Sequence, residues 1–178
     1  MEFDRSWDAL LNLGAGRSYF ALSDGRPFAI DSVDYHAVNA WWLAEMSRLV
    51  YRDGDGPSRS EVLSMVGLDE TAFYDVRGTQ CMLVESPGGE LAVLAFRGSS
   101  TLEDWLRNLN VSLEDWPGGG RVHEGFREAA DEVWQKVAAR LASVTGPLFI
   151  TGHSLGGALA RSVSYWNVLT METDHDEG

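Results

Sequence analysis

The sequence predicts an α/β fold, in which helices flank a sheet that contains parallel strands. The apolar runs at residues 91–96 and 148–151 are typical of strands that are covered on both faces. Between them, residues 124–144 carry apolar side chains at helical spacing, which predicts a long amphipathic helix. Because strand and helix alternate along the chain, we expect the two runs to be parallel members of one sheet.

Length and composition indicate one globular domain. The chain has 178 residues, of which 44% are hydrophobic and 11% aromatic, and it shows no internal repeat or dividing linker. We expect a single, partial domain over residues 1–178, with a loose lead-in at residues 1–16 and an acidic tail at residues 171–178. The net charge of −13 argues against a nucleic-acid partner, because phosphate binding needs clustered Lys and Arg. The sequence leaves the oligomeric state open.

Redox and targeting signals are few. The single cysteine, Cys81, lies in an apolar run and is expected to be a small buried side chain. Met1–Arg5 lacks the basic and apolar regions of a signal peptide, and no apolar run approaches the ~18 residues of a membrane span. A cytoplasmic chain is therefore the default expectation, and apolar contact with a lipid surface stays compatible with the sequence.

The N-terminal part of the chain predicts a hairpin and a helix. Alternation around Asp24-Gly25 predicts a hairpin over residues 19–30. A helix is expected to run from a cap at Asp34 to about Arg52, because its apolar side chains fall on one face. The Gly-rich segment that follows would end this helix.

The remaining elements follow from turn residues and periodicity. A short helix is expected near residues 60–66, and two strands at 80–85 and 91–96 flank the turn Ser86–Gly89. The rest of the prediction is a helix at 101–109, a loop at 116–120, the long helix at 124–144, a strand at 148–151 and a helix at 155–169. Gly146-Pro147 would stop the long helix.

The six residues Gly152–Gly157, GHSLGG, carry the clearest chemical signal. A strand, the pattern G-x-S-x-G and a helix in succession are typical of a nucleophile elbow, a sharp turn that presents a serine hydroxyl. Ser154 would stand at a helix N-terminus, where backbone N–H groups stabilise developing negative charge. The alternative is a tight turn in which Ser154 only caps the helix.

Two further motifs follow apolar segments. Phe96–Ser100 comes directly after the best strand, where a second oxyanion donor is expected, and Ser99 offers both an N–H and a hydroxyl. Ser99 as an ordinary loop serine is the alternative, and Arg97 is expected to form a structural ion pair. In Val122–Phe126, His123 precedes the long helix and is expected to be a hydrogen-bonded structural histidine.

Taken together, these motifs resemble the class 3 lipase family of α/β-hydrolases, which contains fungal triacylglycerol lipases. The matching stretches are Phe96–Ser99, Asp104–Leu106 with Asn108-Leu109, Val122–Phe126 and Thr151–Gly157. The resemblance implies an α/β-hydrolase-like sheet, Ser154 as nucleophile, and an oxyanion hole built from Ser99 and the N–H of Leu155. It implies an ester or lipid substrate and no metal or organic cofactor.

The resemblance also implies a lid helix near residues 101–109. Leu102, Trp105 and Leu106 share one face of that segment, and such a face would cover an acyl-binding groove or turn toward a lipid surface. A fixed surface helix whose apolar face belongs to the core is the alternative.

In this family the catalytic acid and base follow the elbow, on loops after later strands. We find no triad Asp or His here, because Asp174 and His175 follow a helix that carries them away from Ser154. Arg161, Ser162 and Ser164 are also unusual for a buried helix. We therefore expect a chain truncated after the elbow, whether a fragment, a frameshift product or a degenerate member. A non-catalytic binding or assembly protein is the competing hypothesis, and a peptidase or thioesterase is the third.

Overall fold

The computed structural model describes residues 18–53, 56–98, 113–116 and 120–175. A central sheet contains β1 (Asp69–Val76), β2 (Thr79–Glu85), β3 (Ala92–Phe96) and β6 (Leu148–Gly152) in the order β1-β2-β3-β6. β1, β2 and β3 pair antiparallel, whereas β3 and β6 pair parallel, with Phe96 opposite Gly152. The parallel pair confirms the predicted α/β fold and brings the C-terminal ends of β3 and β6 together.

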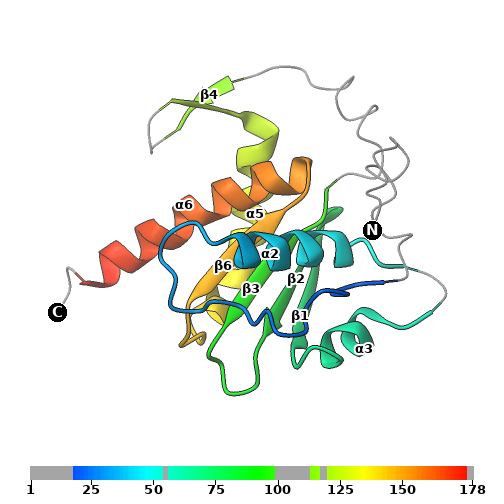
Figure 1. The fold of residues 1–178 in the computed structure, drawn as a ribbon. Helices are drawn as coiled ribbons and strands as arrows, with labels where there is room; N and C mark the ends of the chain where they lie inside the picture. Colours follow the sequence, from blue (N-terminus) through cyan, green and yellow to red (C-terminus); the bar gives the residue numbers. More distant parts are fainter. Residues whose placement is uncertain (1–17, 54–55, 99–112, 117–119, 176–178) are drawn as a thin grey trace.

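Helices cover both faces of this sheet (Figure 1). α2 (Ala37–Leu49) and α3 (Arg59–Ser64) lie on one side, and α5 (Glu124–Leu141) and α6 (Leu155–His175) lie on the other. The strand side chains alternate accordingly, so that Val93 and Ala95 pack toward α2 while Leu94 and Phe96 pack toward α5 and α6. All five residues of β3 are buried, as its apolar sequence predicts.

The predicted helices that fall on described residues are present, with shifted ends. α2 begins at Ala37 after an N-cap at His36, so Asp34 is not its cap; the Asp34 carbonyl oxygen instead accepts a bond from the Ser32 hydroxyl. α3 begins with a capping box in which Ser58 and Glu61 bond to each other's backbone N–H. α5 ends at Leu141, one turn before the predicted Gly146-Pro147 stop.

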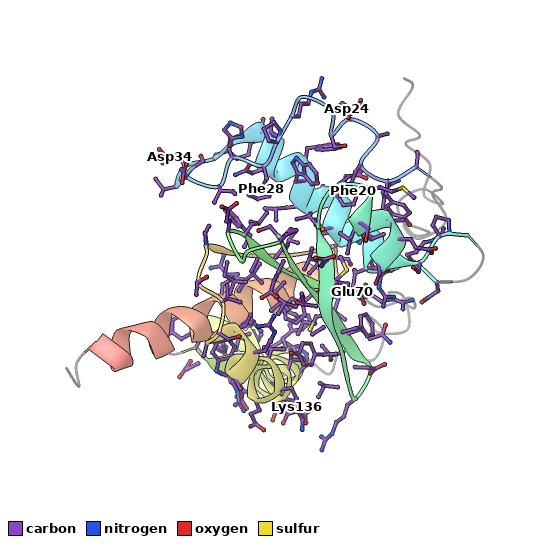
Figure 2. All side chains as sticks on the ribbon, turned by 90° about the horizontal axis from the view of Figure 1, so that it is seen from below. Phe20, Asp24, Phe28, Asp34, Glu70 and Lys136 are labelled. Atoms are coloured by element: carbon purple, nitrogen blue, oxygen red, sulfur yellow. The ribbon has the colours of Figure 1, made fainter. Side chains whose placement is uncertain are left out.

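The predicted hairpin over residues 19–30 is wrong. This segment forms turns, because side chains of α2 satisfy its backbone groups in place of a second strand. The amide of Asn39 bonds to both the N–H and the carbonyl oxygen of Ala29, and the Trp42 indole donates to the carbonyl oxygen of Arg26. Phe20 and Phe28 point inward from the segment (Figure 2), where Phe28 packs 4.7 Å from Phe149.

Two strand pairings were not anticipated. β1 joins β2 through Arg77-Gly78, a two-residue turn with positive φ at both positions. A small separate hairpin pairs β4 (Leu113–Asp115) with β5 (Arg121–His123). α6 also continues to His175, beyond its expected end near residue 169, since no Gly or Pro interrupts it.

Cys81 is fully buried in β2, as predicted, and burial raises the pKa of its thiol to about 12. The predicted lead-in at residues 1–16 and the segment 101–109 with Leu102, Trp105 and Leu106 lie outside the described residues.

Candidate active site

The turn between β6 and α6 has the geometry that the GHSLGG motif predicts. Ser154 adopts φ 57°, a left-handed conformation that is strained for a residue with a side chain. The N–H groups of Gly156 and Gly157 donate to the carbonyl oxygens of His153 (3.0 Å) and Ser154 (2.9 Å), which closes the first turn of the helix. Ser154 therefore stands at the tip of a strand–turn–helix unit, at the positive end of α6.

Close backbone contacts require the glycines around Ser154. A Cβ atom on Gly152 would lie 2.3 Å from the carbonyl of Gly156, so strand and helix would clash across the turn. A Cβ atom on Gly156 would lie 2.5 Å from the carbonyl oxygen of Phe96 at the end of β3. These contacts hold α6 against the C-terminal ends of both parallel strands.

The loop after β3 lies directly beside the elbow. Gly98 is buried, and a Cβ atom there would lie 2.6 Å from the His153 carbonyl oxygen and 3.5 Å from the Ser154 Cβ. Ser99, the predicted oxyanion donor, is the next residue and lies outside the described residues. The structure thus brings the chain that leads into Ser99 next to Ser154.

Tyr51, which follows α2, anchors this loop. Its hydroxyl oxygen accepts a 2.7 Å hydrogen bond from the N–H of Gly98, and its ring packs edge-on against His153 at 6.2 Å. Burial raises the pKa of the Tyr51 phenol, so the hydroxyl stays protonated at neutral pH. The sequence predicts Tyr51 only as a residue near the end of the helix that runs to about Arg52, and no local pattern indicates its contact with Gly98.

Arg97 forms the structural interactions that were predicted for it. Its guanidinium bonds to Asp53 (3.1 Å) and to the side-chain oxygen of Gln80 (2.8 Å), and it lies 5.4 Å from the centre of the Tyr51 ring. The backbone N–H of Arg97 donates to the Gln80 carbonyl oxygen. Arg97 therefore fixes the start of the Gly98 loop from the side opposite the elbow.

His153, beside Ser154, has an unusual environment. Its Nδ1 atom is buried and makes no hydrogen bond to any described residue, and burial lowers the pKa of the ring. Its ring packs against Tyr51. His153 is therefore held as a neutral packing residue in the structure.

His123 is the N-cap of α5, as its predicted structural role requires. Its Nδ1 accepts a hydrogen bond of 3.1 Å from the N–H of Gly125. Within the described residues, no side chain hydrogen-bonds to the Ser154 hydroxyl. The continuous helix α6 carries His175 about 30 Å from Leu155, which agrees with the expectation that His175 does not reach Ser154.

The described residues offer neither a metal site nor a membrane-spanning helix. The described residues contain no group of three or more His, Cys, Asp or Glu side chains arranged to hold a metal ion. Among the helices of the same residues, none is both long and apolar enough to cross a membrane.

Comparison with known proteins gives a consistent result. Residues 93–176 match the family model for lipase (class 3). A lipase of Rhizomucor miehei is 30% identical over 108 residues, which cover 57% of this chain and 29% of that protein. A secreted mono- and diacylglycerol lipase of Fusarium solani is 40% identical over 75 residues, which cover 38% of this chain and 22% of that protein.

The fold agrees with these matches. The structure of a Rhizomucor miehei lipase propeptide complex superimposes with a TM-score of 0.50 and 25% identity, over 57% of this chain and 35% of that one. The chain thus spans less than a third of the length of the two related lipases. These matches support a class 3, fungal lipase-like family of α/β-hydrolases, with the family model matching residues 93–176 of this chain.

Proposed function

We propose that the chain carries the nucleophile of a carboxylic ester hydrolase that acts on lipids or other esters. The observation that supports this most directly is the strained φ of Ser154 at the junction of β6 and α6. Ser154 is exposed, and backbone strain of this kind clusters at functional sites. The related lipases make an ester substrate the natural choice.

In the proposed reaction, Ser154 Oγ attacks the ester carbonyl carbon while a histidine base takes its proton. The new bond from Oγ to carbon forms as the carbonyl π electron pair moves to oxygen. When that pair returns and restores the carbonyl, the ester C–O bond breaks and the alcohol leaves with the proton from the histidine. Water then cleaves the acyl-enzyme by the same steps, which releases a carboxylic acid and restores the serine.

The oxyanion would be held by backbone N–H groups. At the start of α6, the N–H groups of Gly156 and Gly157 are bonded within the turn, whereas no described residue accepts from the N–H of Leu155. Leu155 is therefore the proposed first donor, and Ser99 is the proposed second donor because the Gly98 loop lies against the elbow.

A second candidate function is a non-catalytic α/β-hydrolase-like protein that acts in binding or assembly. It is favoured by one observation: within the described residues, the Ser154 hydroxyl has no histidine partner to activate it. Without a base, a serine hydroxyl at neutral pH is a weak nucleophile.

Labelling of the purified chain with a fluorophosphonate probe distinguishes an ester hydrolase from a non-catalytic binding protein. An ester hydrolase should be labelled in the wild type and should turn over a p-nitrophenyl ester, and Ser154→Ala should abolish both. Ser164→Ala is the matched control, because Ser164 lies on the same helix and its hydroxyl donates to the Ala160 carbonyl oxygen within that helix.

Labelling that persists in Ser154→Ala would reject Ser154 as the nucleophile. A folded wild-type chain with neither labelling nor turnover would favour the binding protein.

A further inference from the structure

A cleft of about 590 Å³ opens along α6, away from the elbow. Its walls are the β4–β5 hairpin, the start of α5 and one face of α6, and Figure 1 shows the hairpin beside α6. This volume lies within the range of sites that bind small molecules. Neither Ser154 nor Leu155 is among the described residues that line the cleft, so it is a feature that the reaction at Ser154 leaves unexplained.

The lining combines aromatic rings with arginine. Trp116, Phe126 and Tyr165 contribute the rings, and Trp116 packs 5.1 Å from Tyr165. Rings of this kind provide an apolar surface that contacts an aliphatic or aromatic chain.

The charge of the cleft is opposite to that of the chain. The sequence has 27 Asp and Glu against 14 Lys and Arg, yet the described lining contains Arg121 and Arg161 and no carboxylate. Arg121 is partly engaged, because it donates to the Leu113 carbonyl oxygen at 2.7 Å and lies 4.0 Å from Asp115. Arg161 is exposed and has no hydrogen bond or ion pair to any described residue. Its guanidinium is therefore available to bind an anion.

The cleft runs along one face of α6, the helix that follows Ser154. Ala158, Arg161 and Tyr165 line the cleft at spacings of three and four residues. Positions with these spacings lie along one helix face. The seven residues from Ser154 to Arg161 span about 10 Å along the axis. The cleft therefore lies within about two helical turns of Ser154, measured along α6.

We propose that this cleft binds a monocarboxylate with an apolar tail, the acid that ester hydrolysis at Ser154 would release. Arg161 binds the carboxylate, and Trp116, Phe126 and Tyr165 contact the tail. The choice of a carboxylic acid as the ligand rests on the proposed function. The presence of the cleft and its positive charge are independent of that function. This explains why an arginine, unusual on the helix that follows an elbow, occupies position 161.

Isothermal titration of the Ser154→Ala chain with decanoate tests the proposal. Decanoate should bind, and decanol, which has the same tail and no charge, should bind at least about tenfold more weakly. Arg161→Gln should weaken decanoate binding by about tenfold and leave decanol binding unchanged. Arg26→Gln is the matched control, since it removes an equal charge from an exposed site outside the cleft.

Absence of decanoate binding, equal binding of decanoate and decanol, or equal effects of Arg161→Gln and Arg26→Gln would each overturn the proposal. Because Ser154→Ala cannot form an acyl-enzyme, the result does not depend on catalysis. If the wild-type chain binds decanoate but is not labelled by the fluorophosphonate, the acid-binding site is supported and the hydrolase function is rejected. If the chain is labelled but does not bind decanoate, only the acid-binding site is rejected.

Discussion

The hydroxyl oxygen of Tyr51 accepts a 2.7 Å hydrogen bond from the N–H of Gly98. The bond joins the end of α2 to the loop after β3, two segments that lie 47 residues apart in the chain. A Cβ atom on Gly98 would lie 2.3 Å from this oxygen and 2.6 Å from the His153 carbonyl oxygen. α2, the Gly98 loop and the elbow therefore meet at one residue, and the position of the loop depends on Tyr51.

Replacement of Tyr51 by Phe should loosen this loop. The ring and its packing against His153 remain, but the N–H of Gly98 loses its acceptor in a buried position. We expect faster hydrogen exchange at the Gly98 amide and a decrease of about 1 kcal/mol in the free energy of unfolding. Amide exchange followed by NMR and urea denaturation measure the two effects.

Tyr35→Phe is the control for this substitution, because the Tyr35 side chain is 86% exposed and lies far from the loop in sequence. It should change neither quantity. If Gly98 exchanges at the wild-type rate in Tyr51→Phe, the hydroxyl does not anchor the loop. If the protein is an active esterase, Tyr51→Phe should also lower kcat more than it raises KM, because the oxyanion loop acts mainly in the transition state.

Gly156 and Gly157 offer a graded test of the contact between α6 and β3. A Cβ atom on Gly156 would lie 2.5 Å from the Phe96 carbonyl oxygen, whereas one on Gly157 would lie 3.2 Å from the Gly152 carbonyl oxygen. Gly156→Ala should therefore lower the free energy of unfolding by about 2 kcal/mol or more. Gly157→Ala should stay within about 1 kcal/mol of the wild type, because alanine also favours the helix.

Thermal and urea denaturation of the two alanine variants give the comparison. Both substitutions add one methyl group to the first turn of the same helix, so each serves as the control for the other. Equal stability of the two variants would show that α6 does not pack closely on the end of β3.

Local patterns explain which parts of the fold were predictable. The buried strand β3, the amphipathic helix α5 and the turn at Ser154 are each encoded by adjacent residues, through apolar runs, helical spacing and paired glycines. β1 lacked such a signal. It is an edge strand with half-buried side chains on one face, and its turn uses Arg77, not the Asn or Asp typical of a two-residue hairpin.

Contacts between distant segments explain the rest. Residues 19–30 alternate like a hairpin, but Asn39 and Trp42 bond to their backbone, and no pattern within the segment reveals this. The role of Tyr51 has the same origin, since its partner Gly98 follows a different element. The Ser154 turn was predictable from sequence, whereas the residues that surround it depend on tertiary structure.

Burial of His153 predicts a dependence of stability on pH. Its Nδ1 has no hydrogen-bond partner among the residues that the structure describes, and burial lowers the pKa of the folded-state ring below the ordinary value of 6.5. When the pH falls through 6.5, the unfolded chain takes up a proton at this ring before the folded chain does. The unfolded state then binds more protons, so the free energy of unfolding increases with pH in this range.

The stabilisation by His153 should therefore be complete above pH 6.5 and be lost as the pH falls toward the folded-state pKa of the ring. In His153→Asn, which keeps a polar side chain but cannot titrate, the free energy of unfolding should depend less on pH between about pH 5 and pH 7. Urea denaturation across this range, with the exposed His36 replaced by Asn as the control, gives the comparison. If the free energy of unfolding depends on pH as steeply in His153→Asn as in the wild type, other groups cause the dependence. His153 would then be a packing residue whose protonation does not affect stability.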